Sequence, residues 1–189
     1  MNYCLHSALA IVSSIVFSIP PSSLAQSRVP STTQNLLLEV MATHTTMISE
    51  DTYVFLRVFS DGTAEYQLSK FSNAENNKVP PIRKAMTQSE FIKIESSVND
   101  PKLTKVGPRY GVNFALDTST EWIIKIRRPR APQIIHILEF APSLAKTMKG
   151  PYPDALLRLG CNVLGLRAQL SGEPVSLDNQ CKGVLDSSK

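Results

Sequence analysis

The densest group of side chains with binding potential is a cluster of cations between positions 125 and 130. Its members are Lys125, Arg127, Arg128 and Arg130, with Lys102, Lys105 and Arg109 upstream. Side chains alternate between the faces of a strand, so Lys125 and Arg127 would share a solvated face opposite two isoleucines. This pattern predicts a basic β-ribbon that could contact an acidic protein or an anionic envelope surface. The plain alternative is the ordinary polar face of an edge ribbon.

Two histidines remain beyond the first 25 residues, His44 and His136. His136 alternates with apolar residues, which is typical of a hydrogen-bonded histidine in a sheet. His44 lies among threonines, which favours a surface or loop position. Either one could act as a general base beside a carboxylate. A small extracytoplasmic hydrolase with a His/carboxylate site is therefore the alternative function.

Motifs of well-known catalytic and cofactor sites are absent from the sequence. It contains no nucleophile elbow, HExxH helix, phosphate-binding loop, dinucleotide fingerprint or EF-hand loop. A zinc site needs three or four ligands, and no spacing of histidine, cysteine and carboxylate points to one. We therefore assign no catalytic residue, no metal and no cofactor from the sequence.

The first 25 residues have the pattern of a secretory signal peptide. They contain no Asp, Glu, Lys or Arg, an apolar stretch runs from Ala8 to Ile19, and Ser23-Leu24-Ala25 is a small-x-small cleavage site. We expect cleavage after Ala25 and a secreted or periplasmic protein without a transmembrane segment in its mature chain. An uncleaved N-terminal anchor is the alternative.

Export changes the interpretation of the cysteines, because cleavage removes Cys4 and leaves Cys161 and Cys181. Two cysteines in an oxidising compartment most simply form a disulfide. Such a bond would be worth about 3 kcal/mol on the loop-entropy estimate and would tie the C-terminal tail back to the domain. A buried free Cys161 with an exposed Cys181 is the alternative.

A β-hairpin from Tyr53 to Leu68 is the clearest structural signal. Asp61-Gly62 separates two β-rich runs and is typical of a type I′ turn, in which both residues take a positive φ. If these residues form the loop, the pairs are Phe59 with Ala64, Arg57 with Tyr66 and Phe55 with Leu68. The covered face would then consist of Phe55, Phe59, Ala64, Tyr66 and Leu68.

Capping signals and periodicity predict the other elements. A helix should begin at Thr87, which forms a capping box with Glu90, and end before Asn99. A second helix should run from about Pro153 to Leu170. Further strands are expected at Leu36–Ala42, Tyr110–Leu116, Glu121–Arg128 and Gln133–Phe140. The last two of these strands are nearly continuous in apolar residues, so we expect both of their faces to be nearly covered. Loops are expected at Ser69–Pro81 and Ala141–Pro151.

The sequence resembles small secreted bacterial domains of uncharacterised function. The likeness rests on Asp61-Gly62-Thr63 with Tyr66, then Thr87-x-x-Glu90-Phe91, and then further β runs and a leucine-rich last helix. Those domains have a DGT-x-x-Y hairpin, a helix with a Ser/Thr cap, further strands and a closing helix. The likeness covers about Leu36 to Leu170. It implies an exported α+β domain and no catalytic residues.

Together these signals predict an α+β fold, with an antiparallel sheet of about five or six strands and two helices packed against it. The expected organisation is a signal peptide (1–25), a flexible lead (26–35), a single domain (36–170) and a C-terminal tail (171–189) tied back by the disulfide. A hydrophobic content of 42% and a charged content of 19% fit a globular domain.

The function expected from the sequence is a secreted or periplasmic, non-enzymatic binding or interaction module. Its anionic partner would meet the basic β-ribbon. Nucleic acid is disfavoured as that partner, because the chain is exported and its net charge is only +4. A purely structural role, as an inhibitor or an envelope-assembly subunit, is compatible with the same features.

Overall fold

The computed structural model describes residues 36–68, 80–111, 118–148, 152–172 and 177–186. The chain divides into residues 1–30 and 31–189, and every described residue belongs to the second unit. The predicted signal peptide and flexible lead therefore lie outside the described residues, as does most of the loop expected after Leu68.

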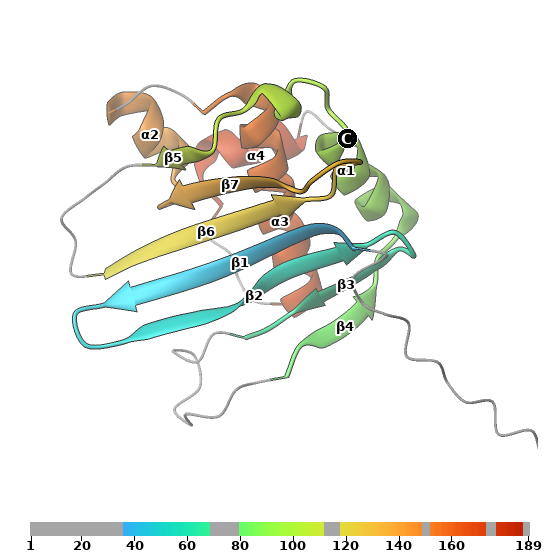
Figure 1. Cartoon of the computed structure of the whole chain (residues 1–189), viewed down its shortest axis with the longest axis horizontal. Coiled ribbons are helices and arrows are strands. Elements are labelled where there is room, and N and C mark those ends of the chain that lie inside the picture. The colour runs from blue at the N-terminus through green and yellow to red at the C-terminus, as the bar shows by residue number, and fades with distance from the viewer. Residues whose placement is uncertain (1–35, 69–79, 112–117, 149–151, 173–176, 187–189) are drawn as a thin grey trace, which may run out of the picture. The chain divides into compact units, whose positions relative to one another are not determined.

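A seven-stranded sheet in the order β4-β3-β2-β1-β6-β7-β5 is the centre of the fold (Figure 1). Neighbouring strands are antiparallel except β5 and β7, which are parallel. The strands are β1 (Leu36–Thr46), β2 (Glu50–Phe59), β3 (Thr63–Tyr66), β4 (Ile82–Ala85), β5 (Arg109–Gly111), β6 (Thr118–Ile126) and β7 (Gln133–Leu138). The helices are α1 (Gln88–Val98), α2 (Pro142–Met148), α3 (Asp154–Ser171) and α4 (Asn179–Asp186), with a short 3₁₀ turn, η2 (Leu103–Lys105).

The α+β class is confirmed, but several details of the expected architecture were wrong. The sheet has seven strands instead of five or six, and one pairing is parallel. The described residues also form four α-helices instead of two. The additional helix α2 occupies the stretch expected to be a loop, and α4 occupies the expected tail.

The β2–β3 hairpin differs from the prediction by one residue of register. Arg57 pairs with Glu65 and Val58 with Ala64. The N–H of Gly62 donates to the Phe59 carbonyl at 3.2 Å, and Gly62 has a φ of 77°. Asp61 does not share that conformation, because Glu139 is the one non-glycine residue with a positive φ in the described ranges.

The side chain of Asp61 explains this different turn. Its Oδ1 accepts hydrogen bonds from the Thr63 N–H at 3.0 Å and the Thr63 hydroxyl at 2.6 Å. The loop is therefore of the longer class that ends in a left-handed glycine. The slip of one residue places Leu56 and Val58, which are fully buried, on the same face as Ala64 and Tyr66. Of the two phenylalanines expected on the covered face, Phe59 is buried and Phe55 is partly buried against the core.

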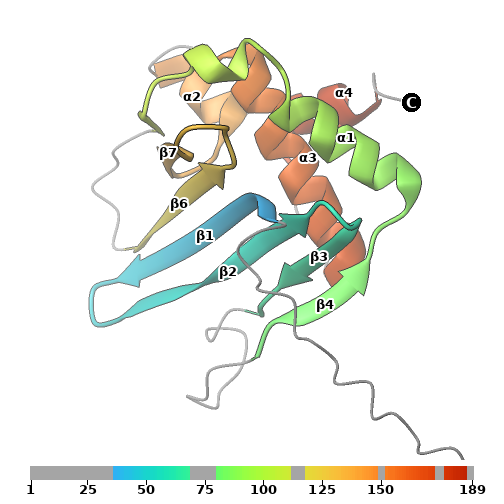
Figure 2. The same cartoon turned by 45° about the vertical axis from the view of Figure 1, so that its right-hand side comes forward.

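One face of the sheet carries the core, and α1 and α3 cover it (Figure 2). Fully buried strand residues include Leu38, Val40, Leu56, Ile124 and Ile126. They meet Ile94 of α1 and a stripe on α3 made of Leu156, Leu159 and Val163. In Figure 1 α3 lies behind the sheet, so that view presents the face without helices. The expectation that β6 and β7 are covered on both faces was wrong, since Ile134 is 43% exposed.

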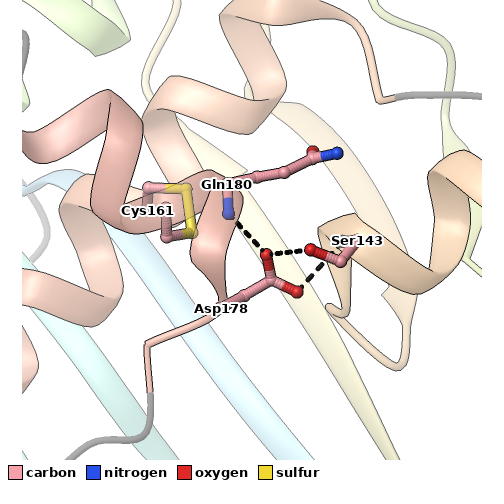
Figure 3. Close-up of a disulfide and its surroundings, with 5 residues drawn as sticks. Ser143, Cys161, Asp178 and Gln180 are labelled. Atoms are coloured by element: carbon pink, nitrogen blue, oxygen red, sulfur yellow. Dashed lines mark hydrogen bonds between the residues drawn. A yellow bond between two sulfur atoms is a disulfide. The ribbon is translucent and has the colours of Figure 1, made fainter.

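The C-terminal segment is held against the domain by a disulfide and a carboxylate (Figure 3). Cys161 of α3 and Cys181 of α4 are joined by a disulfide, the pairing expected from the sequence. Asp178 accepts hydrogen bonds from the Ser143 N–H, the Ser143 hydroxyl and the Gln180 N–H at 3.0, 2.6 and 2.8 Å. Burial would raise the pKa of Asp178, but these hydrogen bonds outweigh it and hold the pKa below its usual range. The side chain therefore caps α4 and links it to α2.

Candidate functional site

The structure divides the predicted basic ribbon into two regions. Lys125 is the next-to-last residue of β6 and lies on the face without helices, whereas Arg128 and Arg130 lie in the connection between β6 and β7. Arg127, directly after β6, is exposed, and its N–H donates to the Leu37 carbonyl at 3.0 Å. The alternation expected for this strand is confirmed, because Ile124 and Ile126 are fully buried while Lys125 is exposed.

Lys125 belongs to a row of alternating charges that crosses five neighbouring strands, from β6 to β4. Its Nζ lies 3.0 Å from Glu39 Oε1, and Arg57 Nε lies 2.7 Å from Glu39 Oε2. Arg57 is 3.8 Å from Glu65, which is 3.3 Å from Arg83. We call this row, which consists of Lys125, Glu39, Arg57, Glu65 and Arg83, the ion-pair ladder. Its cations all have carboxylate partners.

Glu39 is the most buried member of the ion-pair ladder, with 8% of the residue exposed. Burial alone would raise its pKa. The hydrogen bonds and positive charges of Arg57 and Lys125 outweigh this effect and hold the pKa of Glu39 below its usual range. The carboxylate is therefore a structural counter-ion, and Lys125 is not a free cation on the surface.

Arg128 has a different environment, because neutral oxygens hold its guanidinium. Its Nε and Nη2 donate to Gln133 Oε1 at 3.1 and 2.8 Å, and its Nη1 donates to the Val98 carbonyl at 2.8 Å. Val98 is the last residue of α1, so Arg128 also satisfies the C-terminal end of that helix. Partial burial lowers the pKa of Arg128. Within the described ranges no carboxylate forms an ion pair with it.

A shallow hollow of about 400 Å³ lies at this connection. It is lined by Thr104, Arg128, Pro129, Arg130 and Gln133. Gln133 joins its two sides, because its Nε2 donates to the Leu103 carbonyl of η2 at 2.8 Å. The exposed Lys105 follows Thr104 in the same 3₁₀ turn. We call Lys105, Arg128, Arg130 and the residues that line this hollow the basic turn.

The sequence located the arginines of the basic turn but not the residues that hold them. Gln133 and Val98 carry no charge and follow no motif, so nothing in the sequence marked them as partners of Arg128. The upstream lysines had been noted only for their charge. In the structure, the hydrogen bond from Gln133 to Leu103 holds η2 beside the hollow, and Lys105 is the last residue of η2.

The two histidines lie apart and on opposite faces of the sheet. His136 Nδ1 is 2.9 Å from Glu121 Oε1, and about a third of each side chain is exposed (33% and 37%). His44 Nδ1 is 3.0 Å from the Thr120 hydroxyl. His136 pairs with Ile123 of β6, and His44 pairs with Thr120 of the same strand. Paired residues point to the same face, and Ile123 and Thr120 are an odd number of positions apart, so they point to opposite faces. Among the described residues, no group of three or more potential metal ligands is present.

A second hollow, of about 600 Å³, lies between α1, α3 and α4. Its apolar side chains include Ile94, Leu166 and Leu185, and charged residues of α1 and α4 lie around them. Neither histidine lines this hollow or the one at the basic turn. The hollow depends on α4, so the sequence-based prediction of an irregular tail could not have located it.

Comparisons with protein-family models and with curated proteins find no match to this chain. Among the helices in the described part of the chain, none is both long enough and apolar enough to span a membrane.

Proposed function

We propose that this protein is an extracytoplasmic, non-enzymatic binding module that contacts an anionic envelope surface through the basic turn. The observation that supports the proposal most directly is the environment of Arg128. Its guanidinium is held in a fixed orientation by a glutamine oxygen and a backbone carbonyl, beside an open hollow that Arg130 also lines. A fixed cation without a carboxylate partner favours an external anion as its counter-ion.

The compartment supports the same proposal. The Cys161–Cys181 disulfide is compatible with an oxidising environment outside the cytoplasm. The first 25 residues have the composition of a signal peptide. An exported domain of modest positive charge would meet the anionic lipids and polymers of a cell envelope before other partners.

The surface contact can be tested with lipid vesicles of phosphatidylglycerol mixed with phosphatidylcholine. The test variant is Lys105→Glu with Arg130→Glu, since both side chains are exposed and neither forms an ion pair in the described ranges. Each basic residue near an anionic membrane contributes about 1 kcal/mol, so co-sedimentation should weaken by at least about tenfold. Arg128 is left intact, because a carboxylate at that position would face the oxygens of Val98 and Gln133.

The matched control is Lys146→Glu with Lys182→Glu, which makes the same change in net charge on exposed side chains of α2 and α4. This variant should retain most of the wild-type binding. An equal loss in both variants would show that only net charge matters and would remove the basic turn as the contact surface. Wild-type protein that ignores anionic vesicles would remove the proposal altogether.

A second candidate function is a small hydrolase that uses His136, and the contact with Glu121 at 2.9 Å is the observation that favours it. A carboxylate on Nδ1 would orient the imidazole and leave Nε2 to act as a base. However, no hydroxyl or thiol in the described ranges is hydrogen-bonded to His136. Hydrolysis of a simple phenyl ester that is lost in His136→Asn but kept in His44→Asn would support this candidate over the binding module.

A further inference from the structure

The hydrogen bonds of Arg128 leave a defined part of its guanidinium available. Each terminal nitrogen of an arginine carries two hydrogens and Nε carries one. The Nε and Nη2 bonds to Gln133 occupy one edge of the guanidinium, and Nη1 gives one hydrogen to Val98. Nη1 and Nη2 therefore each retain one N–H without a partner in the described structure, and the two share one edge of the guanidinium when Nη1 donates to Val98 through its other hydrogen. A pair of donors on neighbouring nitrogens can bind an oxyanion in a bidentate manner.

The charge around this pair of donors indicates which kind of oxyanion fits. Arg130 lines the same hollow, and Lys105 adjoins Thr104 on its other side. Among the described residues no carboxylate lines the hollow, and the nearby Asp100 is already paired with Arg158. A phosphomonoester carries a charge of about −1.5 to −2 at neutral pH, whereas a carboxylate or a phosphodiester carries only one negative charge. The greater charge is a better match for several uncompensated cations in one place.

We infer that the hollow of the basic turn binds a phosphomonoester, with Arg128 as the bidentate donor and Arg130 and Lys105 as supporting charges. This inference rests on the proposed contact with an anionic surface and specifies the group that is recognised there. Gln133 is a positioning residue, because it fixes the plane of the Arg128 guanidinium and joins β7 to η2. The phosphomonoester could belong to a lipid headgroup or to a free metabolite, since the hollow would recognise the same chemistry in both.

The first experiment uses the wild-type protein and measures binding of glycerol phosphate and of inorganic sulfate by calorimetry. The described residues that line the hollow include no histidine or carboxylate. The hydrogen bond from the Lys102 N–H, together with the hydrogen bond and charge of Arg158, holds the pKa of Asp100 below its usual range. A pH dependence should therefore come from the ligand. Binding of glycerol phosphate should weaken several-fold between about pH 7.5 and about pH 5, because its second pKa is about 6, while sulfate binding stays constant.

The second experiment separates geometry from charge with two conservative variants. Arg128→Lys keeps the charge but removes the paired donors, and it should weaken glycerol phosphate binding by about tenfold or more. Arg109→Lys is the matched control and should bind within about twofold of wild type, because that exposed residue of β5 does not line the hollow. Equal effects of the two variants, or a pH-independent affinity in the wild-type protein, would overturn the inference. The wild-type pH profile decides the question even if Arg128→Lys weakens the fold.

Vesicles distinguish the sources of the phosphate and separate this inference from the proposed function. Stronger binding to phosphatidic acid than to phosphatidylglycerol at equal surface charge would identify a lipid monoester as the source. Binding to free glycerol phosphate with no such lipid preference would identify a soluble ligand. Equal binding to both lipids together with no binding of glycerol phosphate would overturn the inference but leave the proposed surface contact standing. Failure to bind any anionic vesicle would remove the surface contact.

Discussion

The ion-pair ladder and the basic turn contain the same kinds of cation but compensate them differently. Lys125 and Arg128 are only a few residues apart in the chain. Lys125 has Glu39 as its partner, whereas Arg128 has the oxygens of Gln133 and Val98. Both side chains are held in place, yet only one of them is neutralised. Whether a cation is available to a ligand therefore depends on the groups that it contacts. Its position in the sequence is a poorer guide.

The two arrangements have different consequences for stability and for binding. In the ion-pair ladder a largely buried carboxylate bonds to two cations, so its removal should cost folding free energy. In the basic turn neutral acceptors orient Arg128 without cancelling its charge, so its positive potential extends into the hollow. Changes in the ladder should alter stability and leave binding intact, and changes at Arg130 or Lys105 should do the opposite.

The largest expected effect on stability comes from Glu39→Ala, which removes the carboxylate that two cations of the ion-pair ladder share. The substitution leaves Arg57 and Lys125 facing each other without their shared carboxylate. Since hydrogen bonds to charged groups contribute about 1.5–3 kcal/mol, we expect the free energy of unfolding to fall by about 2 kcal/mol in urea titrations.

Vesicle binding of the folded Glu39→Ala protein serves as the control and should equal that of wild type. Unchanged stability would mean that water compensates the exposed cations and that the ladder is only a surface feature. Weakened vesicle binding would instead show that the ion-pair ladder and the basic turn are coupled.

A smaller effect is expected in the pH dependence of stability. The pKa of Glu39 is lower in the folded protein than its ordinary value of 4.5. A group of this kind contributes stability that is present above its unfolded pKa and is lost as the pH falls through its folded pKa. The stability difference between wild type and Glu39→Gln should therefore be constant near neutral pH and shrink as the pH falls below 4.5. A difference that grows on acidification would contradict the lowered pKa.

Local chemistry made part of the fold predictable. The capping box at the start of α1 was predicted from Thr87 and Glu90, and both of its hydrogen bonds are present. The Glu90 N–H donates to the Thr87 hydroxyl at 3.3 Å, and the Thr87 N–H donates to Glu90 Oε2 at 2.6 Å. The closing helix α3 and its glycine stop also follow from neighbouring residues, and Gly172 has a φ of 71°. These features depend on residues within a few positions of each other, which a sequence displays directly.

Features that depend on distant partners could not be predicted. Glu39 and Lys125 are 86 residues apart, and Arg128 and Val98 are 30 apart. No periodicity reveals such pairs, so the sequence placed Lys125 and Arg128 in one surface although the structure separates them. Helix α4 depends in the same way on Ser143 and on Cys161 for its position. The hairpin register was missed for a more local reason, since the bonds of Asp61 to Thr63 select a longer loop than the Asp-Gly pair suggested.

The smallest effects come from single alanine substitutions in each region, and they test the comparison most directly. Lys125→Ala removes the end of the ion-pair ladder, and because the Lys125 side chain is 45% exposed we expect a loss of only about 0.5 kcal/mol of stability. Vesicle binding should not change beyond the effect of net charge.

Arg130→Ala should leave stability unchanged, since the described structure gives that side chain no hydrogen bond to lose, but should weaken vesicle binding by about fivefold. Urea titration and co-sedimentation of both variants provide the measurement. If Lys125→Ala weakens binding as much as Arg130→Ala does, the pairing with Glu39 does not remove a lysine from the contact surface, and the whole ribbon acts as one charged patch.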